Sequence, residues 1–232
     1  MKTLKPIRDL NRTRSPKRTV LIIDDHVVVR KGLICLIDQE QDLTVCGESG
    51  DATTAFDAIS RLNPDVVLVD ISLPGTSGIE FIKNGKACHP DLPIVVFSMH
   101  DESLYAERTL RAGALGYVMK GVGGEEITTA LRKALQGKIH TSDRINATLM
   151  ERFLGRRKLE NETPASVLSD RELEIFELIG NGKSSREISA SLKISIKTVE
   201  SHRLHIKEKL GLRTGMDLVR RAVNHVENGM AA

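Results

Sequence analysis

Short apolar segments alternate with amphipathic segments through residues 19–136, and this alternation limits the possible folds more than any other feature of the chain. The apolar segments are Thr19–Asp24, Thr44–Glu48, Val66–Asp70, Pro93–Ser98 and Leu115–Met119. Segments with helical spacing follow them at Val27–Ile37, Ala52–Leu62, Gly78–Lys86, Ser103–Ala112 and Gly124–Gln136. Strand and helix alternating in this way predict an α/β doubly wound, five-stranded parallel sheet with helices on both faces.

The strand pattern ends after Gly137, and the rest of the chain has helical patterns. Asp143–Leu154 is the first of them, and the polar segment GRRKLENETPAS, residues 155–166, predicts a linker. Ser169 and Glu172 have the spacing of a capping box at the start of the next helix. Further helices are expected at Ser185–Leu192, Ile196–Leu210 and Met216–Glu227. The sequence therefore predicts a second, all-α four-helix domain.

Charge is distributed unevenly along the chain, although its formal net charge is only +3. Residues 1–18 have seven Lys or Arg and one acid, and we interpret residues 1–17 as a disordered basic tail. Residues 19–140 have 11 basic and 17 acidic residues, whereas residues 141–232 have 16 basic and 13 acidic residues. An acidic domain followed by a basic one suggests that the second domain faces a polyanion.

Cysteine usage and hydropathy indicate a cytoplasmic protein. The three cysteines have neither metal-binding nor CxxC spacing, which is typical of a reduced compartment. Apolar runs all fall short of the ~18 residues of a membrane span, so no membrane contact is expected. The basic N-terminus has no apolar segment of the kind found in secretory signals.

Polar residues follow the predicted strands at one edge of the predicted sheet. Asp24 and Asp25 end the first strand, and Asp70 ends the third. Carboxylates that lie this close repel one another unless a cation joins them, and Mg²⁺ prefers such oxygen ligands. Ser98 ends the fourth strand and Lys120 follows the fifth, so a hydroxyl and an ammonium would complete a site for a phosphoryl group. Taken alone, each residue has an ordinary structural explanation, and the combination is what favours a site.

The segments IIDDH, LVDISLPGTSG, VVFS and GYVMK resemble the landmarks of a response-regulator receiver domain, which is flavodoxin-like, over residues 18–137. This resemblance implies that Asp70 is the phosphoacceptor. It implies that Asp25, Asp70 and the backbone carbonyl of Ser72 bind Mg²⁺, with Asp24 assisting. Ser98 and Lys120 would contact the phosphoryl group, and Tyr117 matches the aromatic residue that rotates inward on activation.

The helix predicted at Ile196–Leu210 has two different faces. Val199, Arg203, Ile206 and Leu210 form one stripe, and polar residues occupy the opposite face. A short helix, a turn and such a helix describe a helix-turn-helix, although an ordinary four-helix domain with a solvated face fits equally well. Residues 164–229 are similar to the LuxR-type output domain of the NarL/FixJ response regulators, which favours the helix-turn-helix. Residues 138–163 are then a helix and linker, and Ser184–Arg203 is the helix-turn-helix.

The resemblance also implies a DNA-binding surface on this helix. Glu200, Ser201 and Leu204 match positions that face base edges, and the candidates for phosphate contacts are Lys197, Thr198, Arg203 and Lys207. Some relatives have basic residues at the positions of Glu200 and Leu204. Glu can accept a hydrogen bond from cytosine N4 and Leu can contact a thymine methyl group, so the preferred DNA sequence cannot be carried over from any relative.

These features predict a two-component transcription factor rather than an enzyme acting on an external substrate. Its expected partners are a sensor histidine kinase, double-stranded DNA and, when phosphorylated, a second copy of the chain. The apolar stripe that favours a homodimer is Leu218, Val219, Ala222, Val223 and Val226, which also suits the interior of the domain. The alternatives are a haloacid-dehalogenase-type phosphohydrolase, which has two Asp two residues apart, and a ligand-sensing LuxR regulator, whose pocket is rich in aromatic residues.

Overall fold

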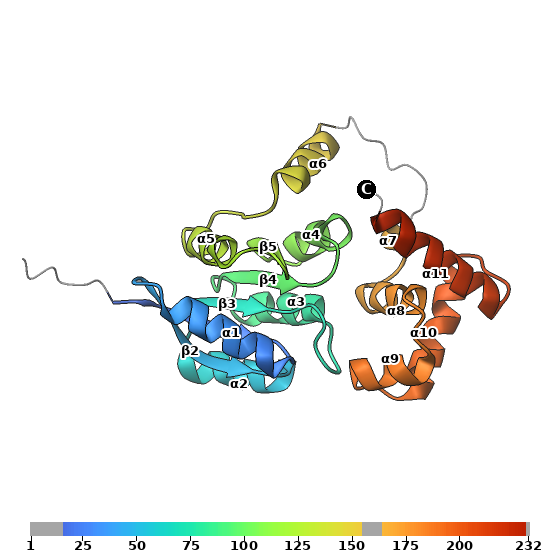
Figure 1. Cartoon of the computed structure of the whole chain (residues 1–232), viewed down its shortest axis with the longest axis horizontal. Coiled ribbons are helices and arrows are strands. Elements are labelled where there is room, and N and C mark those ends of the chain that lie inside the picture. Colours follow the sequence, from blue (N-terminus) through green and yellow to red (C-terminus); the bar gives the residue numbers. More distant parts are fainter. Residues whose placement is uncertain (1–15, 155–163, 231–232) are drawn as a thin grey trace, which may run out of the picture.

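The computed structural model of the chain describes residues 16–154 and 164–230. Figure 1 shows a sheet domain followed by a helix, α6, and then by a helical domain that lies beside the sheet domain. Nearly all of the predicted basic tail and most of the predicted linker lie outside the described residues. No helix in the described ranges is long and apolar enough to cross a membrane.

The sheet has five parallel strands in the order β2-β1-β3-β4-β5. Their bounds are β1 Arg18–Ile23, β2 Leu43–Ser49, β3 Val66–Val69, β4 Ile94–Ser98 and β5 Gly116–Met119. The central strands β1, β3 and β4 are rich in Val, Ile and Leu because helices cover both faces of the sheet, whereas the edge strand β2 is more polar. The predicted fold is confirmed.

Side chains alternate between two apolar cores along each strand. Leu21 and Ile23 of β1 pack with α2, α3 and α4, whereas Val20 and Ile22 pack with α1 and α5. The helices are α1 Val27–Asp38, α2 Ala52–Leu62, α3 Gly78–Cys88, α4 Glu102–Arg111 and α5 Gly124–Leu135. The two-residue repeat of a strand thus directs successive side chains to opposite layers.

The helical domain consists of α8 Asp170–Gly180, α9 Ser185–Leu192, α10 Ile196–Lys209 and α11 Gly215–Met230, with α6 Asp143–Phe153 before it. Ser169 and Glu172 form the predicted capping box, and Ser184 and Glu187 form a second one. Each box joins two backbone amides at the start of a helix to side-chain oxygens, which is why these serines mark the helix starts.

One short helix, α7 Pro164–Val167, lies where we expected the end of the polar linker. Proline is favoured at the first position of a helix because its backbone has no amide hydrogen to leave unpaired there. The next residue, Leu168, is buried among the apolar side chains of α8 and of the sheet domain. Burial of Leu168 explains why this segment is ordered against the domain.

Candidate functional site

The carboxylates of Asp24, Asp25 and Asp70 meet at the carboxyl end of two adjacent strands. Asp24 and Asp25 follow β1, and Asp70 follows β3, which pairs directly with β1. Together with His26, each of them offers a ligand atom within 4.8 Å of the others. The structure therefore brings together the three acids that were predicted to share a site.

Lys120 joins two of these acids. Its Nζ lies 2.6 Å from Oδ2 of Asp24 and 2.6 Å from Oδ2 of Asp70. Burial alone would lower the pKa of Lys120, but the two carboxylates outweigh burial and raise it. Lys120 therefore stays protonated and offsets part of the negative charge in the pocket.

Two carboxylate oxygens in the pocket remain available to a cation. Within the described residues, Oδ1 of Asp70 and Oδ1 of Asp25 are buried and have no hydrogen-bond partner, although His26 Nδ1 lies 2.7 Å from the latter. Unpaired buried anionic oxygens are unfavourable unless a positive charge joins them. This arrangement fits a small hard cation such as Mg²⁺.

The loop after Asp70 is restricted by glycine. Gly75 has a φ of +80°, a backbone conformation that residues with a side chain rarely adopt. The N–H of Gly78 donates a hydrogen bond to the carbonyl oxygen of Ile71. A Cβ atom at Gly78 would overlap the carbonyl oxygen of Asp70. The start of α3 can thus lie directly against the end of β3 only with glycine at this position.

The helix-turn-helix consists of α9, a tight turn and α10. Lys193 ends α9 with a φ of 50°, and the side chain of Ser195 accepts a hydrogen bond from the backbone amide of Thr198 at the start of α10. Val199 and Ile206 are fully buried, as their place in the predicted stripe required. The turn geometry and the buried stripe together determine which face of α10 points outward.

The predicted DNA contacts lie mostly on the exposed face of α10. Lys197, Thr198, Glu200, Ser201 and Leu204 are exposed, whereas Arg203 and Lys207 are half-buried. Glu200, Arg203, Leu204 and Lys207 line a hollow of about 250 Å³ with Gly215 and Leu218 of α11. Glu200 accepts a hydrogen bond from Ser185 of α9, which restrains its carboxylate.

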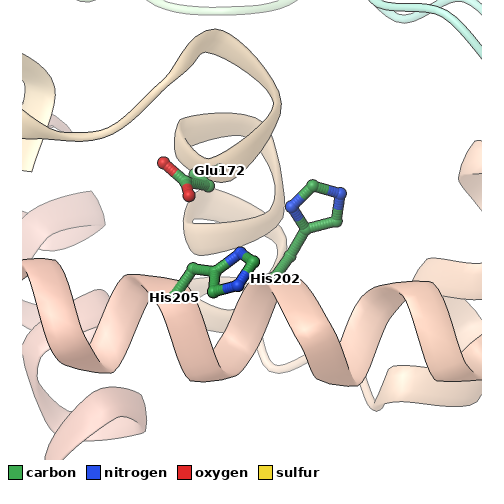
Figure 2. A group of neighbouring side chains, drawn as sticks. All are labelled: Glu172, His202 and His205. Carbon is green, nitrogen blue, oxygen red and sulfur yellow. The ribbon is translucent and has the colours of Figure 1, made fainter.

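A second group of possible metal ligands lies inside the helical domain. Figure 2 shows Glu172 of α8 above His202 and His205 of α10. Oε2 of Glu172 already accepts from the amide of Ser169 at 2.8 Å and from Nζ of Lys209 at 2.6 Å. Because Lys209 supplies the positive charge that a metal would bring, we interpret this group as a helix cap and ion pair.

Two family models match the chain. The response regulator receiver domain matches residues 20–132, and the bacterial regulatory proteins of the luxR family match residues 166–222. Oxygen regulatory protein NreC of Staphylococcus aureus (strain JH9) is 34% identical over 208 residues, which is 88% of this chain and 96% of NreC. The chain belongs to the NarL/FixJ group of response regulators. It is a two-component, DNA-binding transcription regulator with a receiver and a LuxR-type output domain.

Solved structures of response regulators are similar to this one. RcsB of Salmonella enterica serovar Typhimurium, bound to promoter rprA in the presence of phosphomimetic BeF3⁻, is 27% identical with a TM-score of 0.61. The match covers 90% of this chain and 99% of the RcsB chain. A second structure, of the RcsB response regulator of Salmonella typhimurium, concerns conformational dynamism for DNA interaction. It is 28% identical with a TM-score of 0.56, and the match covers 89% of this chain and 98% of that RcsB chain.

In this response regulator, Tyr117 already points into the receiver. It is 2% exposed, and its hydroxyl donates to the backbone carbonyl of His100 at 2.8 Å. Ser98 is fully buried, and its Oγ accepts from the amide of His100 at 3.3 Å. The inward position of Tyr117, which the resemblance associates with activation, thus occurs here while the output domain is docked.

Sequence reasoning missed the residues by which the output domain docks on the receiver. Asp170 of α8 binds Lys83 at 2.8 Å and Arg108 at 2.6 Å. The amide of Gly75, in the loop after Asp70, donates to the carbonyl of Leu192 at the end of α9. Lone acids and bases on predicted helices are usually solvated, so the sequence contained no signal for these contacts.

Another docking contact joins α8 to the loop after β4. Oε2 of Glu177 lies 2.8 Å from Nδ1 of His100 and 3.0 Å from the hydroxyl of Tyr105. Burial lowers the pKa of His100, but the neighbouring Glu177 outweighs it and raises that pKa. Burial raises the pKa of Tyr105 well above its usual range, so its hydroxyl stays a neutral donor.

Proposed function

We propose that a sensor histidine kinase transfers a phosphoryl group to Asp70 and that Mg²⁺ assists the transfer. The single observation that supports this most is the buried Oδ1 of Asp70, which has no hydrogen-bond partner in the described structure and lies among the carboxylates of Asp24 and Asp25 and the ammonium of Lys120. We assign the metal to Asp25, Asp70 and the backbone carbonyl of Ser72, with Asp24 assisting. When bound, Mg²⁺ would neutralise charge on the phosphoryl oxygens.

In this proposal the protein's own residues do the rest of the chemistry. A carboxylate oxygen of Asp70 forms a bond to phosphorus, and the bond from phosphorus to the donor's imidazole nitrogen breaks. The imidazole leaves with the electron pair and takes up a proton. Lys120, already within 2.6 Å of Asp70, then pairs with the added negative charge, and Ser98 turns its hydroxyl toward a phosphoryl oxygen. The protein modifies itself and does not turn over an external substrate.

We further propose that phosphorylation promotes DNA binding by paired output domains through α10. RcsB is described as forming two dimers on two parallel DNAs, and that arrangement supports a homodimer here by likeness. Of the predicted dimer stripe, Leu218 and Ala222 are fully buried, and contacts between α11 and α8 place them in the domain interior. Val219, which is 40% exposed, and Met216, which is 83% exposed, remain available on the outer face of α11.

The test is selection of DNA from a random duplex library by the full chain, with and without acetyl phosphate and Mg²⁺. We expect phosphorylation to enrich defined sequences and to raise affinity for them at least about tenfold, which corresponds to ~1.4 kcal/mol. Affinity for unselected DNA should rise much less, because base contacts add to the phosphate contacts only on the selected sequences. Equal enrichment and equal affinity in both samples would show that phosphorylation does not control DNA binding.

Glu200 and Lys207 should separate base recognition from backbone contact on one helix. Lys207→Ala should weaken binding to selected and random duplexes alike and lower the slope of the salt dependence by about one. Glu200→Ala should instead narrow the difference between the two duplexes by roughly 1–3 kcal/mol, because a base contact is lost. Binding to random DNA should tighten slightly, since Glu200 repels phosphate.

The measurement is a salt titration of each variant on both duplexes. Glu227→Ala, near the end of α11, and Lys138→Ala, just after the receiver, remove the same charges at exposed positions elsewhere and should change neither quantity. An unchanged ratio of selected to random affinity in Glu200→Ala would exclude base recognition through that position.

A further inference from the structure

Arg30, near the start of α1, joins the end of β2 to the turn that contains two of the pocket's acids. Its Nε lies 2.8 Å from Oε2 of Glu48 in β2, and its Nη1 donates to the backbone carbonyl oxygen of Asp24 at 2.6 Å. The side chain is only 14% exposed. Arginine suits this position because its planar fork can donate to two separate acceptors at once. Arg30 thus connects a strand to the backbone beside the acid pocket.

The carbonyl group that Arg30 binds belongs to the peptide bond between Asp24 and Asp25. Because a peptide bond is planar, the direction of this carbonyl fixes the position of the Cα atom of Asp25 and limits where its carboxylate can point. The backbone amide of Asp24 donates to the carbonyl of Ser49 at 3.1 Å. The end of β2 therefore holds both backbone groups of Asp24, one directly and the other through Glu48 and Arg30.

The turn between β1 and α1 differs from the starts of the next three helices. The side chains that precede α2, α3 and α4 accept hydrogen bonds from backbone amides of those helices, whereas the side chain of His26 makes no such bond at the start of α1. The amide of His26 instead donates to Oδ1 of Asp24 at 2.7 Å. That bond restrains the carboxylate of Asp24, and Arg30 restrains its carbonyl.

The positive charge of Arg30 is compensated beside the pocket. Glu48 also binds Nζ of Lys31 at 2.7 Å, and the Lys31 side chain is 64% exposed. Hydrogen bonds from Lys31 and Arg30 hold the pKa of Glu48 below its usual value, so this carboxylate stays ionised at neutral pH. A positive charge near a Mg²⁺ site would by itself repel the metal. Charge and position therefore predict opposite effects on metal affinity when Arg30 is removed.

We propose that Arg30 is a positioning residue for the Mg²⁺ site. By binding the backbone carbonyl of Asp24, it holds the carboxylate of Asp25 toward Asp70. This inference rests on the proposed metal site and adds to it a residue that does not contact the metal. Mg²⁺ requires nearly ideal octahedral geometry, so a misplaced carboxylate lowers affinity even when its charge is kept. Residues that orient metal ligands from outside typically contribute about 10–100-fold to affinity.

The test is a calorimetric titration of the unphosphorylated full chain with Mg²⁺. Arg30→Met keeps most of the side chain's apolar stem and removes the guanidinium, and it should raise the Kd for Mg²⁺ at least about tenfold. In labelling by acetyl phosphate, the half-saturating Mg²⁺ concentration should rise by the same factor, while the rate at saturating Mg²⁺ stays close to that of the wild type. A variant that was only partly folded would instead lose binding sites at unchanged affinity.

The matched control is Lys31→Met. It removes a positive charge from the same partner, Glu48, one position along α1, and Lys31 has no described contact with Asp24. Its Kd for Mg²⁺ should equal that of the wild type or be slightly lower, because a repelling charge is lost.

The outcomes separate this inference from the proposed function. If the wild type binds Mg²⁺ and Arg30→Met binds it equally well or more tightly, Arg30 does not position the site and the metal assignment stands. An equal loss of affinity in Lys31→Met would trace the effect to the charge around Glu48 and overturn the role of the Asp24 carbonyl. A wild type that binds no Mg²⁺ would refute the metal site and this inference with it.

A second variant covers the case in which Arg30→Met does not fold. Arg30→Gln keeps a polar end but is too short to reach the carbonyl of Asp24. It should show the same loss of Mg²⁺ affinity, and wild-type affinity in this variant would equally overturn the proposal.

Discussion

Asp70→Asn should abolish labelling of the protein by acetyl phosphate and Mg²⁺. An amide oxygen is a weak nucleophile without the negative charge of the carboxylate, so no acyl phosphate should form. The variant should fold, because asparagine has nearly the same shape and Lys120 keeps its second partner, Asp24. Phosphorylation-dependent enrichment of DNA should disappear with the labelling. Intact-mass spectrometry and the library selection measure the two effects on the same sample.

The matched control for this change is Asp91→Asn. Asp91 is exposed and precedes β4, so it lies at the edge of the sheet opposite to Asp70. This variant should be labelled at the wild-type rate. Labelling of Asp70→Asn to the wild-type extent would show that another residue accepts the phosphoryl group.

Asp25→Ala should raise the Mg²⁺ concentration needed for labelling by more than ~100-fold. The variant removes only the contact of Asp25 with the exposed His26 at 2.7 Å, so the folded protein loses little. The metal, by contrast, would lose one of its two carboxylate ligands. Asp25 is 19% exposed, which makes a large effect on the stability of the receiver unexpected.

The experiment measures the labelling rate as a function of Mg²⁺ concentration, together with Mg²⁺ affinity by isothermal titration calorimetry. Asp57→Ala, on the exposed face of α2, is the control for removal of one acid from the receiver and should give the wild-type curve. A wild-type half-saturating concentration in Asp25→Ala would refute the metal assignment and leave the phosphoacceptor untouched.

The structure combines two features that the family resemblance would place in different states. Tyr117 is inward and bonded to the carbonyl of His100, while Glu177 keeps the output domain docked on the ring of the same residue. The position of Tyr117 alone therefore does not release the output domain.

Elements with local signals were predicted closely. α2 has the predicted bounds, and Ser169 with Glu172 starts α8 as its capping box required. Capping and apolar periodicity involve residues only a few positions apart, so they are visible in the sequence. Helix ends that have no capping signal in the sequence were predicted less accurately: the third helix was expected to end at Lys86 and ends at Cys88. The apolar stripe on α11 was visible in the sequence. Which of its residues lie in the interior and which lie on the surface depends on how α11 packs against α8.

The sequence by itself determined the parallel sheet and the convergence of Asp24, Asp25, Asp70 and Lys120. Parallel strands place their carboxyl ends at one edge, so the three acids that follow the adjacent strands β1 and β3 must meet, and the long side chain of Lys120 reaches them from the same edge at β5. Only the tertiary structure decided that His100 meets Glu177, 77 positions away, and that Asp170 binds Lys83 and Arg108. Those contacts depend on how two separately folded units pack together. No periodicity or cap specifies such packing, because the hydrogen bonds form only after both surfaces exist.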